Sequence, residues 1–380
     1  MKFSAFAEDA LPVLLAAFVA AAILAFILTP LVRWVAVRVD AVDEPDQRRV
    51  NVVPIPRGGG VAVALSFIVV AAVFVAANNA LRFFPDPVAF EVGRVVALLL
   101  GGAVAAAIGV LDDYFDLRAR WQFAGQLGLA AIAIGFGIVI VRVNIPLGPD
   151  NILLDQPFAV GFTALWIIGM INSINFIDGL DGLSSGVALI AALTLGTISL
   201  TLQGTPQPFV AVLCFALAGA LLGFLRWNFQ PASVFIGTSG VMFVGYTLAV
   251  LSILGTAKVA VALLVLGVPI IDAFWIIVRR LVQGRSPFSP DRGHLHHRLL
   301  DVGLSHRQTV VLIYAICIAL GLLSLFLTGP NQLQAFAGVF VVIGLVLYAL
   351  ARVRIGGSGP GPDVKGADPD LRTAGNQHGG

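Results

Sequence analysis

Charged side chains are scarce in this sequence of 380 residues, which has 23 Lys and Arg, 21 Asp and Glu, and a net charge of +2. This shortage excludes an ordinary soluble domain. The net charge says little by itself, because in a membrane protein the placement of the charges is the informative part. Cysteine is rarer still. Cys214 and Cys317 both lie in apolar stretches, which excludes a disulfide framework and a CxxC metal site. The chain is 58% hydrophobic with a mean hydropathy of +0.96, as expected for a protein of the lipid bilayer.

Long apolar runs predict an all-α, polytopic membrane protein, because about 20 apolar residues in a helix cross roughly 30 Å of hydrocarbon. About eleven runs are long enough to be transmembrane helices. Their approximate spans are 10–32, 58–77, 95–111, 122–141, 158–176, 183–202, 207–225, 240–257, 259–278, 309–328 and 333–351.

The distribution of Lys and Arg predicts the orientation. With the N-terminus outside, only Lys2, Arg82, Arg94, Arg142 and Lys258 of the 23 basic residues fall outside. The positive-inside rule therefore favours a cytoplasmic C-terminus. We expect a membrane domain over 1–352 and a disordered, Gly/Pro-rich cytoplasmic tail over 353–380.

Three acidic residues end the predicted third helix, in "GVLDDYFDL" at 109–117. Asp112, Asp113 and Asp116 lie at a helix C-terminus, where carboxylates are disfavoured unless positive charge compensates. One interpretation is a solvated loop paired with Arg118 and Arg120. The other is a general base or a site for Mg²⁺, which prefers hard oxygen ligands.

A second polar cluster, "NSINFIDGLDGLSSG" at 172–186, ends the predicted fifth helix. Asn172 and Asn175 lie three residues apart, as do Asp178 and Asp181, so each pair could share one helix face. A turn would account for the Asx and Gly residues. It would not account for so many polar groups beside a membrane, so we favour a functional site.

The loop from Arg279 to Arg307 carries "DRGHLHHRLLD" at 291–301. Zinc is a poor fit to its histidines, because Cys is absent nearby and Arg292 and Arg298 would repel a dication. Phosphate is a better fit, because Arg and His donate to its oxygens. Contact with anionic lipid headgroups is the alternative. Asp272, inside the ninth predicted helix, is either a further site residue or an ion-pair partner of the nearby arginines.

These segments resemble the polyprenyl-phosphate N-acetylhexosamine-1-phosphate transferase family, glycosyltransferase family 4. The similar stretches are "VDEPDQRRVNVVPIPRGGG", "DDYFDLRARWQFAGQ", "NSINFIDGLDGL" and "SPFSPDRGHLHHRLLDVGLSHRQ". "HLHHRLL" is similar to the undecaprenyl-phosphate N-acetylglucosamine-1-phosphate transferase branch more than to the phospho-MurNAc-pentapeptide translocase.

The resemblance implies transfer of N-acetylhexosamine-1-phosphate from a UDP-sugar to polyprenyl (undecaprenyl) phosphate, giving polyprenyl-diphospho-sugar and UMP. This would be the first membrane step of a cell-envelope glycan, at the cytoplasmic face of the plasma membrane. The implied cofactor is Mg²⁺, with Mn²⁺ as an alternative. The implied partners are the UDP-N-acetylhexosamine, polyprenyl phosphate, the bilayer and a second copy of the chain, without nucleic acid.

The resemblance also implies roles for individual residues. Asp112 and Asp113 would be catalytic, and with Asp178 they would organise the metal. The substrate would be bound by Asn175, Asp181, Arg292, His294, His296, His297 and Arg298.

The sequence departs from the family pattern at three places. Thr238 stands where a metal-binding Asp is expected, and Gln122 where Lys is common. Asn51, Val52 and Val53 replace a His-x-Lys-like stretch. Two alternatives therefore stay open: a catalytically weak member that binds polyprenyl phosphate, and a flippase or transporter for lipid-linked sugars, which would carry its acids near the bilayer midplane.

Overall fold

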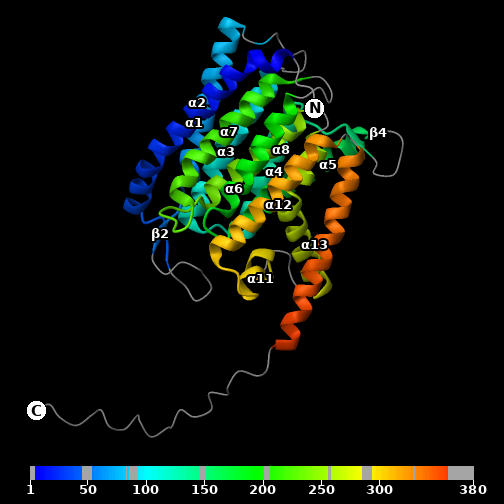
Figure 1. Ribbon diagram of the computed structural model, residues 1–380. Helices are drawn as coiled ribbons and strands as arrows, with labels where there is room; N and C mark the ends of the chain where they lie inside the picture. The colour runs from blue at the N-terminus through cyan, green and yellow to red at the C-terminus, as the bar shows by residue number, and fades with distance from the viewer. Residues whose placement is uncertain are drawn as a thin grey trace, which may run out of the picture.

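The computed structural model describes residues 5–44, 54–82, 84, 92–144, 151–200, 206–255, 258–284, 293–327 and 330–357. Over these residues it confirms the predicted all-α membrane protein (Figure 1). The helices are α1 (Ala5–Arg38), α2 (Gly60–Leu81), α3 (Val92–Phe115), α4 (Ala119–Gly135), α5 (Gln156–Ile177), α6 (Leu183–Ser199), α7 (Pro208–Asn228), α8 (Gly237–Leu254), α9 (Lys258–Val265), α10 (Gly267–Val282), α11 (Leu295–Asp301), α12 (His306–Phe326) and α13 (Pro330–Gly357).

Each of the eleven predicted spans corresponds to a helix, with one break. Eight helices of the described chain are long and apolar enough to cross a membrane, or nine when α9 and α10 count as one bent span. These two helices meet at 79°, because residue 266 interrupts them and Pro269 has no N–H to donate to the last turn of α9. The short helix α11 was not predicted.

The described helices pack closely where small residues face one another. A Cβ atom at Gly219 or Gly223 of α7 would lie 2.1 Å from the Phe18 or Ala22 carbonyl oxygen of α1, respectively. Lipid tails are as apolar as Leu, so close van der Waals packing of this kind replaces the hydrophobic effect between membrane helices. The two central helices, α7 and α8, are the most deeply buried of the candidate spans.

Two short hairpins lie at opposite ends of the bundle (Figure 1). Strands β1 (Val42–Asp43) and β2 (Ile55–Pro56) pair antiparallel, with Val42 opposite Pro56. Strands β3 (Arg142–Asn144) and β4 (Asn151–Leu153) pair antiparallel at the other end. The β1–β2 hairpin and α11 share one end, which brings the loops predicted to be cytoplasmic together.

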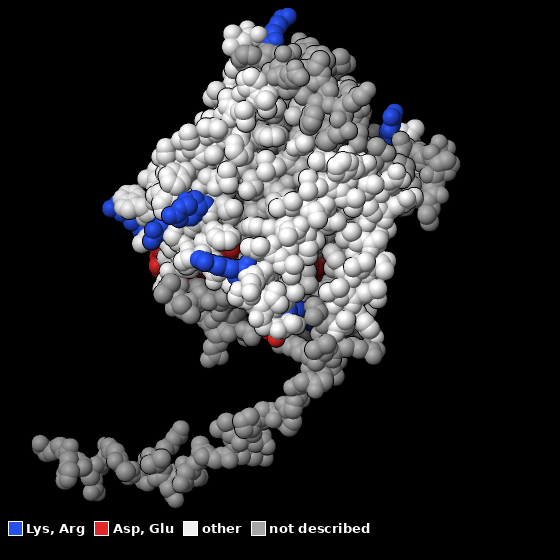
Figure 2. All heavy atoms as spheres, viewed as in Figure 1, with Lys and Arg blue, Asp and Glu red and all other residues white. Residues whose placement is uncertain are grey.

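The surface is divided in the same way. On the face shown in Figure 2, a broad belt of described residues carries neither acidic nor basic side chains, and charges gather toward the end with α11. Helix α13 continues to Gly357, so it passes the predicted domain boundary at residue 352. The rest of the predicted tail lies outside the described residues.

Candidate active site

A cavity of about 370 Å³ opens at the end of the bundle that carries α11. It gathers Asp113, Asn175, Asp178, Asp181 and His297 of the predicted site residues. The other lining residues are Asp43, Arg57, Gly179, Leu180, Asn228, Phe235, Gly237 and Thr238. Residues from five separate segments of the sequence, 43–57, 113, 175–181, 228–238 and 297, therefore meet around one space.

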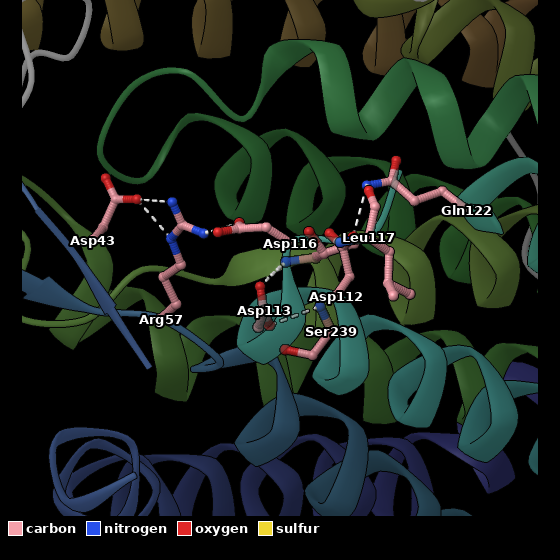
Figure 3. Close-up of polar contacts among 9 residues, drawn as sticks. Asp43, Arg57, Asp112, Asp113, Asp116, Leu117, Gln122 and Ser239 are labelled. Carbon is pink, nitrogen blue, oxygen red and sulfur yellow. Dashed lines mark hydrogen bonds and ion pairs between the residues drawn. The ribbon is translucent and has the colours of Figure 1, made fainter. Parts of the chain in front are cut away.

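Asp113 is held at the cavity wall by the first turn of α8. The Thr238 N–H donates to its Oδ1 atom at 2.7 Å, and the Ser239 N–H donates to its Oδ2 atom at 3.1 Å (Figure 3). A helix N-terminus favours negative charge, because its backbone N–H groups lack partners within the helix. The positive partner expected for this acid is thus the N-terminal end of α8 rather than Arg118 or Arg120.

Asp112 has different partners from its neighbour. Its Oδ1 atom accepts from the Leu117 N–H at 3.0 Å and from Gln122 Nε2 at 2.7 Å (Figure 3). These bonds join the end of α3 to the start of α4. Among the described residues, Asp112 is not part of the cavity lining, so its predicted catalytic and metal-binding roles stay predictions.

The turn between α5 and α6 carries the remaining acids. Ser184 Oγ donates to Asp178 Oδ1 at 2.5 Å, and the Ala232 N–H donates to Asp181 Oδ2 at 3.0 Å. Burial raises the pKa of Asp178 from its usual 3.8 to about 7, and the negative charges of Asp113 and Asp181 add to the rise. The three carboxylates therefore act on one another across the same cavity.

Arg57 brings positive charge to this acidic space. Its Nε donates to Asp43 Oδ1 at 2.6 Å, its Nη2 contacts the same oxygen, and its Nη1 donates to Asp116 Oδ1 at 3.2 Å (Figure 3). The guanidinium thus links the β1–β2 hairpin to the end of α3. The structure shows Arg57, rather than Arg118 or Arg120, as the arginine beside Asp116.

The three histidines of the predicted anion site have separate environments. His297 lines the cavity. His296 is buried behind the cavity wall, where a Cβ atom at Gly179 would lie 2.3 Å from its Nε2. Burial, followed by the neighbouring His297, His294 and His306, lowers the pKa of His296 well below 6.5, so it is neutral at pH 7.

His294 is held by Asp272 of α10. The His294 Nδ1 atom lies 2.8 Å from Asp272 Oδ2, and the Leu295 N–H donates to Asp272 Oδ1 at 2.9 Å. This settles the partner of Asp272, which is the start of α11 and not Arg279 or Arg280. The carboxylate, only 1% exposed, fixes the direction in which the His-rich segment enters the site.

Of the two arginines predicted to bind substrate, the structure describes Arg298, which is not part of the cavity lining. Buried Arg298 donates from Nε to the Gly293 carbonyl at 2.8 Å and from Nη1 to the Leu347 carbonyl, which connects α11 with α13. Arg292 lies outside the described residues, as do Asn51, Val52 and Val53. The substrate-binding roles predicted for Arg292, His294, His296 and Arg298 remain predictions.

Sequence reasoning missed two polar residues of the cavity. Asn228 ends α7, where it accepts from Ser185 Oγ at 2.7 Å and donates to the Val234 carbonyl at 3.1 Å. Asp43 lies on β1 and orients Arg57. The criterion that selected Asn175, a polar side chain at the inside end of an apolar helix, also applies to Asn228.

The donor set suits a hard divalent cation, although it is not a finished metal site. Within the described chain, no three His, Cys, Asp or Glu residues stand in ready coordination geometry. Asp113, Asp178 and Asp181 nevertheless bring mutually repelling carboxylate oxygens to one cavity, which is the ligand chemistry that Mg²⁺ prefers. The Thr238 hydroxyl is a neutral oxygen on the same wall.

Comparison with known proteins gives consistent matches. A family model described as glycosyl transferase family 4 matches residues 95–256. The chain is 32% identical over 338 residues to the probable undecaprenyl-phosphate N-acetylglucosaminyl 1-phosphate transferase of Bacillus subtilis, covering 87% of this chain and 89% of that protein. It is 36% identical over 364 residues to the decaprenyl-phosphate N-acetylglucosaminephosphotransferase of Mycolicibacterium smegmatis, covering 89% and 88% respectively.

Proposed function

This chain belongs to glycosyl transferase family 4, and we propose that it transfers N-acetylhexosamine-1-phosphate from a UDP-sugar to polyprenyl phosphate. An oxygen of the lipid phosphate attacks the sugar-bearing phosphorus of the donor. The bond from that phosphorus to the bridging oxygen breaks, and UMP leaves with the electron pair. The products are polyprenyl-diphospho-sugar and UMP.

The observation that carries this proposal is the cavity at the helix ends. Four carboxylates, Arg57 and His297 surround it, at the end of an apolar bundle where a lipid and a water-soluble nucleotide can meet. Phosphoryl transfer depends mainly on charge neutralisation and alignment, which such a lining provides. A transporter would need its acids near the midplane. Asp113 lies near the end of α3, and Asp178 follows α5 directly.

The chemistry of each side chain in the cavity suits it to a different role. Asp113, Asp178 and Asp181 would hold Mg²⁺, or Mn²⁺, which when bound neutralises charge on the reacting phosphates. Asn175 and His297 offer polar contacts to the donor. Asp113 also keeps the first turn of α8 against the cavity, so this wall is formed before the substrates arrive.

We place the protein in the plasma membrane with the cavity facing the cytoplasm. The basic residues predicted to lie inside support this orientation, because they favour the cytoplasmic leaflet. UDP-sugars are then available to the cavity directly.

The test is release of UMP by the purified, full-length protein with UDP-N-acetylhexosamines, polyprenyl phosphate and Mg²⁺. We expect Asp178→Asn to lower kcat/KM by about a hundredfold or more, because it removes a charge at the reacting phosphates. Asp155→Asn is the matched control, since Asp155 is exposed at the opposite end of α5 and makes no capping bond. Absence of UMP with every UDP-sugar would refute the proposal.

A further inference from the structure

Arg57 lines the cavity, and its contacts indicate a role that the proposed transfer chemistry does not yet assign. We propose that Arg57 is a phosphate-binding residue, which leaves Asp116 and takes a phosphate oxygen of a substrate while Asp43 holds its guanidinium in place. This inference rests on the proposed function, since both of its substrates carry phosphate.

The backbone around Arg57 is fixed from two sides. The Arg57 N–H donates to the Ala41 carbonyl, the Phe235 N–H to Pro56, and the Gly59 N–H to Phe235, each at 2.9 Å. Residues 56–59 are therefore bonded both to the chain after α1 and to the chain before α8. The start of the Arg57 side chain moves little in such a frame.

The same frame brings Arg57 beside Asp113. Gly237 has a φ of +70°, and a Cβ atom there would lie 2.8 Å from the Gly58 N atom and 2.6 Å from Asp113 Oδ2. A side chain at residue 237 would push these segments apart. Gly237 thus lies against both the loop of Arg57 and the carboxylate of Asp113, so Arg57 and Asp113 line the same cavity close to the expected reaction centre.

The two carboxylates that contact Arg57 are unequal. The Asp43 side chain is 10% exposed and contacts Nε and Nη2, whereas the Asp116 side chain is 86% exposed and reaches only Nη1, at 3.2 Å. An exposed ion pair contributes little, so a phosphate can displace Asp116 at small cost. Asp43, being buried, stays in place and keeps the guanidinium directed.

Arg57 also has donors to spare. Its contacts within the described chain use three of the five N–H groups that a guanidinium carries. Release of Asp116 frees a third for a ligand. A planar guanidinium suits phosphate because it donates to two oxygens through parallel N–H groups in a fixed plane, an arrangement that a Lys ammonium lacks.

The acidic side chains around the cavity explain why a cation such as Arg57 is needed there. Asp43, Asp113, Asp178 and Asp181 all line the cavity, and an incoming phosphate would meet their repulsion. A fixed cation on the same wall offsets part of it. Both the diphosphate of the nucleotide sugar and the monophosphate of the lipid have the required chemistry, so the experiment must separate them.

The experiment measures KM for each substrate with the other saturating, in wild type, Arg57→Gln, Arg57→Lys and Asp116→Asn. We expect Arg57→Gln to raise KM for one phosphate substrate by about tenfold to a hundredfold, with the other changed less than twofold. Arg57→Lys should recover part of the loss. Asp116→Asn should lower the same KM by about twofold or more, because the competing carboxylate is gone.

A binding assay keeps this inference separate from the transfer reaction. Thermal unfolding of the same variants is measured with UDP-N-acetylglucosamine alone and with dodecyl phosphate alone. At least one probe should stabilise wild type and fail to stabilise Arg57→Gln. This result would support the role of Arg57 even if no UMP were released, in which case only the transfer reaction would be refuted.

Two results with the Arg57→Gln variant would overturn the inference. One is Arg57→Gln with both KM values within twofold of wild type and the same ligand stabilisation. The other is Arg57→Gln with a lower melting temperature and kcat but unchanged KM, which would make Arg57 a structural link between the hairpin and α3. Failure of both probes to stabilise wild type would also count against it.

Discussion

Identical carboxyl groups do different work at this site because their neighbours differ. Asp112 joins α3 to α4, Asp113 accepts two backbone N–H groups of α8, and Asp178 faces the cavity with a raised pKa. Successive residues on a helix point about 100° apart, so the adjacent acids of α3 cannot share one environment. At this scale, neighbouring groups decide which acids can act on substrate.

Thr238→Asp tests whether a carboxylate is useful at the first turn of α8. The Thr238 side chain is half-buried on the cavity wall, so the new acid would join the oxygen donors there. We expect the Mg²⁺ concentration for half-maximal UMP release to fall by about tenfold, equivalent to about 1.4 kcal/mol. Without metal, added repulsion among the acids should lower the melting temperature.

Thr238→Asn is the control for this substitution, because it is similar in size to Asp but carries no charge. Its Mg²⁺ dependence should match that of wild type. An equal gain in Thr238→Asn and Thr238→Asp, or no gain in either, would show that a carboxylate at residue 238 has no part in metal binding.

Asp272→Asn tests the contact that orients the His-rich segment. The amide oxygen can still accept from the Leu295 N–H, but the amide nitrogen can only donate to His294 Nδ1, which requires a ring tautomer with the proton on Nε2. We expect KM for the UDP-sugar to rise by about tenfold, while KM for polyprenyl phosphate stays the same.

Two controls sharpen this prediction. Combining Asp272→Asn with His294→Gln should give less than the sum of the single effects, because the residues are in contact. Asp301→Asn, at the exposed end of α11, should leave both KM values unchanged. Additive effects of Asp272→Asn and His294→Gln would contradict a shared role.

Helix contacts depend on whether a glycine faces a neighbour. Gly219 of α7 meets the Phe18 carbonyl of α1, whereas Gly169 of α5 has open space where a Cβ atom would lie. We expect Gly219→Ala to lower the melting temperature in detergent. Gly169→Ala should leave it unchanged or raise it, because Ala is about 1 kcal/mol better than Gly within a helix. Equal effects of the two substitutions would show that α1 and α7 do not depend on this close approach.

The sequence allowed prediction of most elements but not of their interruptions. Runs of apolar residues identify membrane helices without knowledge of tertiary structure, so each predicted span appears as helix. The 79° bend at residue 266 falls within a single predicted span, 259–278, where hydropathy alone gives no signal of a break. Helix α11 is too short for a periodic pattern, and the Asp272 contact that holds its first residue comes from α10.

The sequence pointed to some residues of the cavity lining and not to others, for related physical reasons. Polar groups at the ends of apolar helices cost free energy unless they face a cavity or a partner. This argument selected Asp113, Asn175, Asp178 and Asp181 from the sequence. Which side chains face the cavity depends on packing between segments, such as the contact of Gly179 with His296. The contribution of Asp43 depends on a hairpin that is too short to recognise in sequence.

The whole molecule has two unlike ends, and its orientation can be tested with cysteine labelling. Cys214 and Cys317 are buried, so wild type provides an unreactive background for an impermeant maleimide. Val302, directly after α11, is 57% exposed, and Leu153, on β4 at the other end, is 67% exposed. We expect Leu153→Cys to react in intact cells and Val302→Cys to react only after permeabilisation, because the basic loops favour the cytoplasm. The reverse pattern would put the cavity outside, away from cytoplasmic UDP-sugars, and would exclude the proposed reaction in cells.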